Sequence, residues 1–175
     1  MGQEASSYLQ NIAELSVTFA AVTILLPVVR QIKGGRLSGA DIHLLTTFMT
    51  AGFVASIGAL LPGVLELMYL SGTALWMTAS GLAAFLQAVA LIRIQLERRR
   101  LSMDRSPSMV LAGFASYWLA IGILVFNAFA APFQGAGLHA LAVTLCLATA
   151  MWLFVRRVGT LRGGRSEEDW NLKAD

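Results

Sequence analysis

The stretch RIQLERRRLSMDR, residues 93–105, decides the fold class because it concentrates charge between two long apolar segments. It holds five of the 13 Lys and Arg residues, and the others all lie within residues 30–36 or from Arg156 to the C-terminus. The segments between these three stretches carry no basic residue. This alternation is typical of a polytopic membrane protein whose basic loops remain in the cytoplasm.

The overall composition agrees with a membrane protein. Of the 175 residues, 57% are hydrophobic and only 13% are charged, which is too little charge to cover the apolar surface in water. The net charge of +3 is divided by side, because Glu4, Glu14 and Glu66 fall on the side that has no basic residue. This asymmetry indicates contact with anionic lipid headgroups and argues against nucleic-acid binding.

The apolar segments have the length of transmembrane helices, which need about 20 residues to cross a hydrocarbon core of roughly 30 Å. We expect five such helices, at residues 8–29, 42–61, 68–92, 109–131 and 138–155. The second is expected to end at Pro62-Gly63. The connections are too short for a soluble domain, and residues 156–175 are expected to form a short tail. The predicted fold is an all-α integral membrane protein with its N-terminus outside and its C-terminus in the cytoplasm.

Basic residues beside the predicted helices are expected to anchor this topology and to contact lipid headgroups. They are Arg93, Arg98, Arg99, Arg100, Arg156 and Arg157. The N-terminal segment lacks the positive charge of a signal peptide, so we expect the first helix to be retained. A compact chain with short loops fits the bacterial inner membrane.

Small residues recur at helical spacing, which lets helices approach closely in lipid. The expected packing positions are Ala51, Gly52, Ala55 and Ala59 in the second segment, and Ala112, Ser116 and Ala120 in the fourth. Packing within one chain accounts for most of them. Five helices need fewer small faces than the sequence offers, so we also expect self-association or contact with another membrane subunit.

Glu14 is the first candidate for a functional residue. It lies 16 positions before Arg30, or about 24 Å along a helix, which places it just inside the outer boundary of the hydrocarbon. Asn11 and Thr18 share its face on a helical wheel. This polar stripe is interpreted either as the lining of an ion or proton path, or as a helix end among the headgroups from which Glu14 reaches water.

Other polar residues are expected near the same outer level, namely Glu66, Asn127 and His139. Histidine and carboxylate at one depth can relay protons or bind a cation. Gln87 lies in the inner part of the third segment, where interhelical hydrogen bonding is its expected role and pore lining the alternative. A lone cysteine and two histidines on opposite sides favour neither a metal site nor a cofactor.

The sequence contains no HExxH, CxxC, GxSxG or P-loop motif, so we do not expect an enzyme. The favoured function is transport by a small oligomeric channel or ion-coupled carrier, with a preference for cations because the outer face is acidic. The alternative is a non-enzymatic accessory or scaffold subunit of a larger membrane complex. A homo-oligomer with a polar path favours the first function, and co-purification of another membrane subunit favours the second.

Overall fold

The computed structural model describes residues 2–32, 39–100, 107–130 and 134–163, and this part of the chain forms five helices. They are α1 (Gln3–Ile32), α2 (Gly39–Leu67), α3 (Gly72–Arg100), α4 (Pro107–Phe129) and α5 (Ala136–Gly163). Each contains a stretch long and apolar enough to cross a membrane. The prediction of an all-α integral membrane protein with five apolar helices is therefore confirmed.

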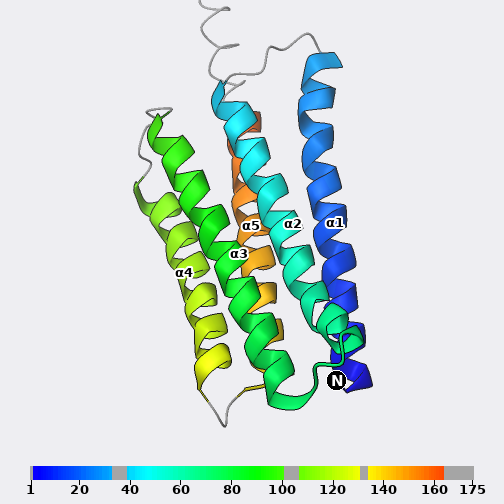
Figure 1. Cartoon of the computed structure of the whole chain (residues 1–175). Coiled ribbons are helices and arrows are strands. Elements are labelled where there is room, and N and C mark those ends of the chain that lie inside the picture. The colour runs from blue at the N-terminus through cyan, green and yellow to red at the C-terminus, as the bar shows by residue number, and fades with distance from the viewer. Residues whose placement is uncertain (1, 33–38, 101–106, 131–133, 164–175) are drawn as a thin grey trace, which may run out of the picture.

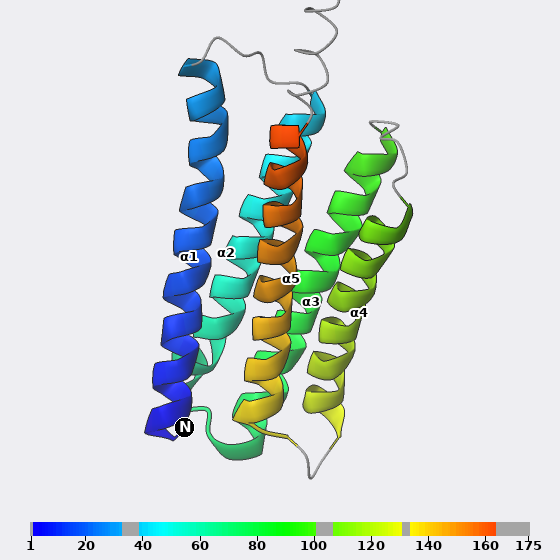
Figure 2. The same ribbon diagram turned by 180° about the vertical axis from the view of Figure 1, so that it is seen from behind.

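The last helix, α5, packs on one side of the row formed by the other four helices. Figure 1 shows α1, α2, α3 and α4 side by side with α5 behind α2 and α3, and Figure 2 shows α5 in front when the molecule is turned. α5 contacts each of the other helices, whereas α1 contacts only α2 and α5 among the described residues. The second of these contacts includes a hydrogen bond of 3.0 Å between the hydroxyls of Tyr8 and Thr144. α1 is therefore an edge helix with one face open.

The packing of α1 against α2 depends on Gly52. A Cβ atom at this position would lie 3.0 Å from the Ser16 carbonyl oxygen and 3.0 Å from the Ala20 Cβ, so only glycine permits this approach without a shift of α1. The other predicted packing positions differ in exposure. Ala55, Ala59 and Ala120 are buried, Ala51 and Ser116 are intermediate, and Ala112 is exposed. Most of these small residues therefore serve packing within the chain.

The second helix does not end at Pro62-Gly63, as the sequence predicted, but continues to Leu67. Proline has no N–H and cannot donate to the carbonyl of the residue four positions earlier, which is Gly58. A transmembrane helix tolerates such a proline where a neighbouring group satisfies the freed carbonyl. The partner of the Gly58 carbonyl therefore decides whether α2 can continue.

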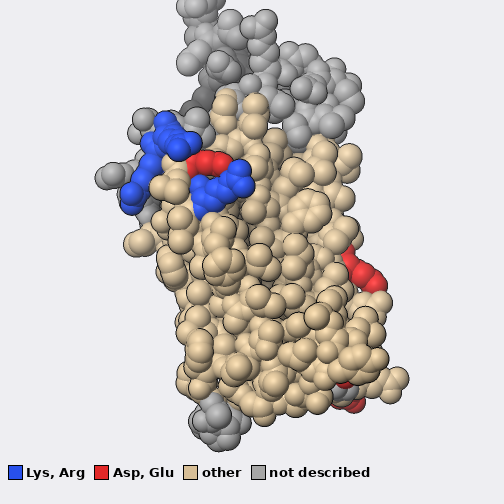
Figure 3. Space-filling model, in the orientation of Figure 1, with Lys and Arg blue, Asp and Glu red and all other residues tan. Residues whose placement is uncertain are grey.

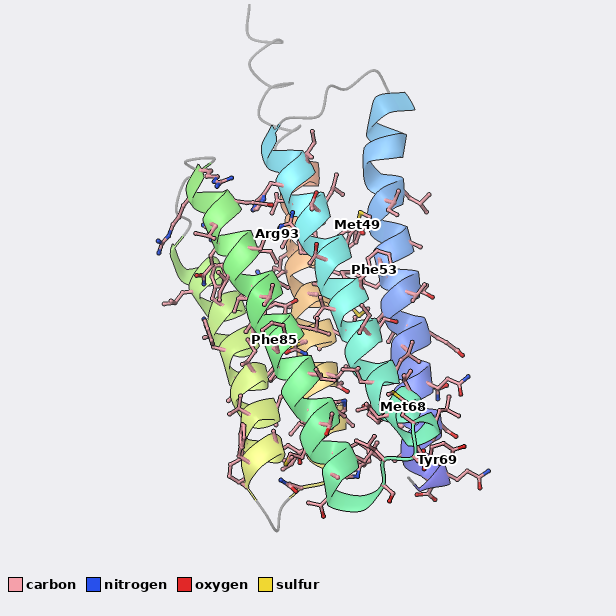
Figure 4. The ribbon with its side chains drawn as sticks, viewed as in Figure 1. Met49, Phe53, Met68, Tyr69, Phe85 and Arg93 are labelled. Atoms are coloured by element: carbon pink, nitrogen blue, oxygen red, sulfur yellow. The ribbon has the colours of Figure 1, made fainter. Side chains whose placement is uncertain are left out.

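The end of α2 is closed by its own backbone. The N–H of Leu70 donates to the Leu65 carbonyl at 3.1 Å, and the N–H of Tyr69 donates to the Glu66 carbonyl at 3.0 Å. Tyr69 adopts a φ of 63°, the left-handed conformation that this type of helix end requires and that glycine usually supplies. Figure 4 shows Tyr69 in this turn, where its side chain is 97% exposed.

Basic side chains gather at one end of the bundle. α3 continues beyond its predicted span, so that Arg93, Arg98, Arg99 and Arg100 lie on the final turns of the helix. On the face drawn in Figure 3, the blue Arg side chains gather at this end, which we call the basic end. Arg156 of α5 is exposed, and its guanidinium lies 5.7 Å from the centroid of the Trp152 ring. The side chain of Arg157 lies outside the described part of the structure.

Candidate functional site

His139 of α5 supplies the hydrogen-bond donor that Pro62 lacks. Its Nε2 atom lies 2.9 Å from the carbonyl oxygen of Gly58. A carbonyl only accepts, so Nε2 carries the proton and donates it. A Cβ at Gly58 would lie 3.5 Å from a methyl group of Val143, an ordinary contact, so α5 packs directly against this turn of α2. The break that Pro62 makes in the backbone ladder of α2 is thus satisfied by α5.

The second nitrogen of His139 continues the network into α3 and α4. The Ser80 hydroxyl lies 3.0 Å from Nδ1 and donates to it, and the Ser80 oxygen accepts from Nδ2 of Asn127 at 2.8 Å. A neutral imidazole satisfies both of its contacts in this arrangement. His139, Ser80 and Asn127 are each 0% exposed. A single chain of donors therefore joins α4, α3, α5 and α2.

Asn127 also ties the start of α5 to α4. The Gly135 N–H donates to Oδ1 of Asn127 at 2.9 Å, and Nδ2 donates to the Gly135 carbonyl at 3.1 Å. The Trp76 ring lies beside the imidazole, with 5.9 Å between the ring centroids of Trp76 and His139. Every side-chain nitrogen and oxygen of His139, Ser80 and Asn127 has a protein partner. The network is closed, which suits it to holding helices together and leaves no group free for a substrate.

The described residues contain no group of three or more His, Cys, Asp or Glu side chains that could hold a metal ion. No family model, curated protein or solved structure matches this chain. A function for this chain is therefore inferred from the geometry of the bundle.

The predicted polar stripe of α1 faces away from the bundle. Asn11, Glu14 and Thr18 are all exposed, whereas Ala13 and Ser16 on the opposite face of the helix are buried. The Thr18 hydroxyl is satisfied locally, because it donates to the Glu14 carbonyl at 2.9 Å. No described residue forms an ion pair with the Glu14 carboxylate. If this stripe lines a path, the path runs outside the single bundle.

Glu14 also lies further from the end of the bundle than the count from Arg30 predicted. Gly52 packs against Ser16 and Ala20, so in antiparallel helices Glu14 lies about level with Ser56. At 1.5 Å per residue, this level is about 15 Å along α2 from Glu66 at one end and about 20 Å from the first turns at the other. The carboxylate therefore projects from the middle of the apolar height of the bundle.

The outward faces of α2 and α3 expose large apolar side chains, as does that of α1, which also exposes Asn11, Glu14 and Thr18. Figure 4 shows Phe53 of α2 and Phe85 of α3 directed away from the bundle, and these side chains are 49% and 65% exposed. Such faces suit lipid directly. An acidic side chain at the middle of a bilayer costs about 2.5–3.5 kcal/mol on insertion scales. Glu14 is therefore the residue that distinguishes the α1 face.

The remaining predicted candidates lie elsewhere. Glu66 is exposed near the end of α2 opposite the basic end. Gln87 is 3% exposed inside the bundle, where its Oε1 accepts from the Cys146 thiol at 3.0 Å. The candidate residues thus occupy four separate places: the outward face of α1 (Asn11, Glu14, Thr18), the closed network (Asn127, His139), the interior at Gln87, and the turn at Glu66. They do not form one pathway through the bundle.

The sequence analysis missed several polar contacts between helices, and two of them concern residues that are distant in the sequence. The first is the role of Ser80 and the Gly58 carbonyl, although a proline inside an apolar run is a signal that the carbonyl four residues earlier needs a donor. The second is a pair at the basic end, where Nδ1 of His43 lies 3.4 Å from a carboxylate oxygen of Glu97. Nothing in the sequence pairs these two residues, because they come from different helices.

Proposed function

We propose that this protein is a small oligomeric transport protein of the membrane, a channel or ion-coupled carrier that favours cations. The observation that supports the proposal is the position of Glu14. Its side chain is exposed on the outward face of α1, about halfway along the height of the bundle. A carboxylate facing acyl chains is costly, whereas one facing a second protein surface or a water-filled path is not. Assembly of copies through α1 removes Glu14 from lipid.

Copies assembled around an axis next to α1 bring several Glu14 carboxylates near one another. Like charges at short range repel each other unless a cation or a shared proton lies between them. A ring of carboxylates is also a common means of selecting cations in a channel. Asn11 and Thr18, on the same face, add polar groups along this path. The α1 face therefore offers the chemistry of a cation path once it is enclosed.

A path between copies is favoured over one through a single bundle. The buried network around His139 uses its polar groups to bind one another, and it spans four of the five helices. Opening a path there requires breaking several hydrogen bonds inside an apolar core. A path along the outward face of α1 requires only that a second copy of the protein enclose that face.

The proposal includes an orientation and a compartment. The basic end faces the cytoplasm, because Lys and Arg accumulate in cytoplasmic loops, and the N-terminus then lies outside. The membrane is the bacterial inner membrane. In this orientation Glu66 lies at the outer mouth, where an acidic residue raises the local concentration of cations. The arginines of the basic end contact anionic headgroups.

The test combines the mass of the assembly with ion flux. The purified protein is measured in lipid nanodiscs with the lipid mass subtracted, and cation flux is then measured in proteoliposomes. We expect a defined homo-oligomer whose flux falls or changes selectivity in Glu14→Gln, with the assembly intact. Glu4→Gln is the matched control, because it removes the same charge from the first turn of the same helix. Equal flux in the wild type and Glu14→Gln excludes Glu14 from the path.

A second candidate function is that of an accessory or scaffold subunit. The closed polar interior favours it, because a bundle whose buried groups bind one another has no evident chemistry of its own. The outward face of α1 then contacts a different membrane subunit that pairs with Glu14. A monomeric mass for the isolated chain, together with co-purification of another membrane protein that Glu14→Gln abolishes, supports this function over transport.

A further inference from the structure

Small residues line a partly open cavity between the helices, separate from the network around His139. Ala51 and Ala55 of α2 and Ala90 of α3 line it, and α4 and α5 contribute one residue each. Its volume is about 20 Å³. A space of at least roughly 10–15 Å³ on this measure accommodates one water molecule. The cavity is therefore large enough for one water and too small for an organic ligand.

A buried polar atom with no partner lies at this cavity. Gln87 lines it and is only 3% exposed. Its Oε1 accepts from the Cys146 thiol at 3.0 Å, whereas its Nε2 has no hydrogen-bond partner in the described structure. Rotation of the amide by half a turn exchanges the two atoms and still leaves one of them unsatisfied. In the apolar interior of a membrane protein such a group needs a partner.

A second polar group borders the same space. Tyr117 of α4 is among the residues that line the cavity. A phenol both donates and accepts, and a primary amide nitrogen donates twice. Buried waters are held by two to four polar partners. Gln87, Tyr117 and the neighbouring Cys146 sulfur together meet this requirement.

We propose that this cavity is a binding site for a single water molecule, which accepts from Nε2 of Gln87 and bonds the Tyr117 hydroxyl. The water satisfies the amide that the protein leaves unpaired, and it joins α3 to α4 in the middle of the bundle. An apolar side chain in its place fills the space but leaves Gln87 without a partner. The small side chains of Ala51, Ala55 and Ala90 leave the space that the water occupies.

The proposed water is isolated from the other polar groups along α3. Ser80 lies seven residues from Gln87 towards one end, or about 10 Å, and Glu97 lies ten residues away towards the basic end, or about 15 Å. Both separations exceed the reach of a hydrogen bond to one water. The site therefore stands apart from Ser80 and Glu97 along α3.

The direct test is nuclear magnetic resonance on the wild-type protein in nanodiscs with ¹⁵N-labelled glutamine. We expect cross-relaxation between water and the Gln87 side-chain amide with the sign of a long-lived bound water. Gln87→Met identifies the signal by removing it. The exposed Gln10 amide is the control, because it meets only rapidly exchanging solvent. An assigned Gln87 amide without a water cross-peak overturns the proposal.

A substitution that displaces the water gives an independent readout. Ala90→Val places two methyl groups at the cavity wall, so it should lower the Tm of the wild type by stranding the Gln87 amide. In the Gln87→Met background, where no amide needs the water, the same substitution should leave the Tm unchanged or raise it. A Tm of Ala90→Val equal to or above that of the wild type shows that the space is dry and overturns the proposal.

Discussion

Replacing Pro62 by alanine supplies α2 with the N–H that proline lacks, and in a regular helix this N–H donates to the Gly58 carbonyl. The carbonyl then has two donors competing for it, the new N–H and Nε2 of His139 at 2.9 Å. His139→Leu leaves the carbonyl unsatisfied when residue 62 is proline, and satisfied when residue 62 is alanine. We therefore predict that His139→Leu lowers the free energy of unfolding more when residue 62 is proline than when it is alanine.

The size of this dependence is set by one interhelical hydrogen bond. Such bonds average about 0.6 kcal/mol in membrane proteins and reach about 1.7 kcal/mol. The bond is fully buried, so we expect a coupling energy between Pro62→Ala and His139→Leu in the range of about 0.6–1.7 kcal/mol. The contact of His139 with Ser80 is lost in both backgrounds and cancels in the cycle.

The measurement is reversible unfolding of the four variants in bicelles, followed by circular dichroism as the detergent fraction is raised. The control cycle pairs Pro62→Ala with Thr149→Val, because the Thr149 hydroxyl donates only to the Leu145 carbonyl of its own helix. Independent sites are additive within about 0.3–0.5 kcal/mol. The reasoning is refuted if the cycle with His139→Leu is as additive as this control.

Three further predictions use the same unfolding measurement. Gly52→Ala should destabilise the bundle by about 1–3 kcal/mol, because its Cβ would lie only 3.0 Å from the backbone of α1 and force a shift there. Gly81→Ala, with open space at its Cβ, should stabilise the bundle by about 0.5–1 kcal/mol. Equal changes in stability at the two glycines contradict the close approach of α1. Tyr69→Gly should stabilise the end of α2 by about 1 kcal/mol, since glycine adopts its φ of 63° without strain, and a loss of stability contradicts this helix end. Glu97→Gln should lower the free energy of unfolding by less than about 1 kcal/mol, because the pair with His43 spans 3.4 Å and the Glu97 side chain is 39% exposed. A larger loss of stability contradicts this weak pairing.

The helices were predictable because the length of an apolar segment and the positions of basic residues determine whether it spans a bilayer. These features depend little on tertiary contacts. The end of the second helix was not, because the effect of a proline depends on what meets the freed carbonyl. Pro62 alone predicts a stop, and Pro62 with His139 permits five more residues of helix to Leu67. His139 follows 77 residues later in the chain. The sequence around Pro62 therefore does not predict the contact with His139.

The level of Asn127 and His139 was predictable from the sequence, whereas the depth and the direction of Glu14 were not. Asn127 and His139 were placed near one level by counting residues, and the structure joins them through Ser80. The face of α1 could not be decided in the same way, because this helix has polar residues on both sides. Ser16 faces inward and is satisfied by donating to the Ile12 carbonyl at 2.7 Å, whereas Glu14 faces outward. A hydroxyl that bonds its own backbone can be buried at little cost, and a carboxylate cannot.

This difference between the two faces explains why α1 is the element on which the proposed function depends. The network around His139 joins α2, α3, α4 and α5 and includes no residue of α1. α1 is held instead by close packing at Gly52 and by its contact with α5. A four-helix unit with its polar groups satisfied therefore carries a fifth helix that turns a carboxylate outward. Since lipid is the least favourable neighbour for that carboxylate, contact with another protein surface gives Glu14 its most stable environment.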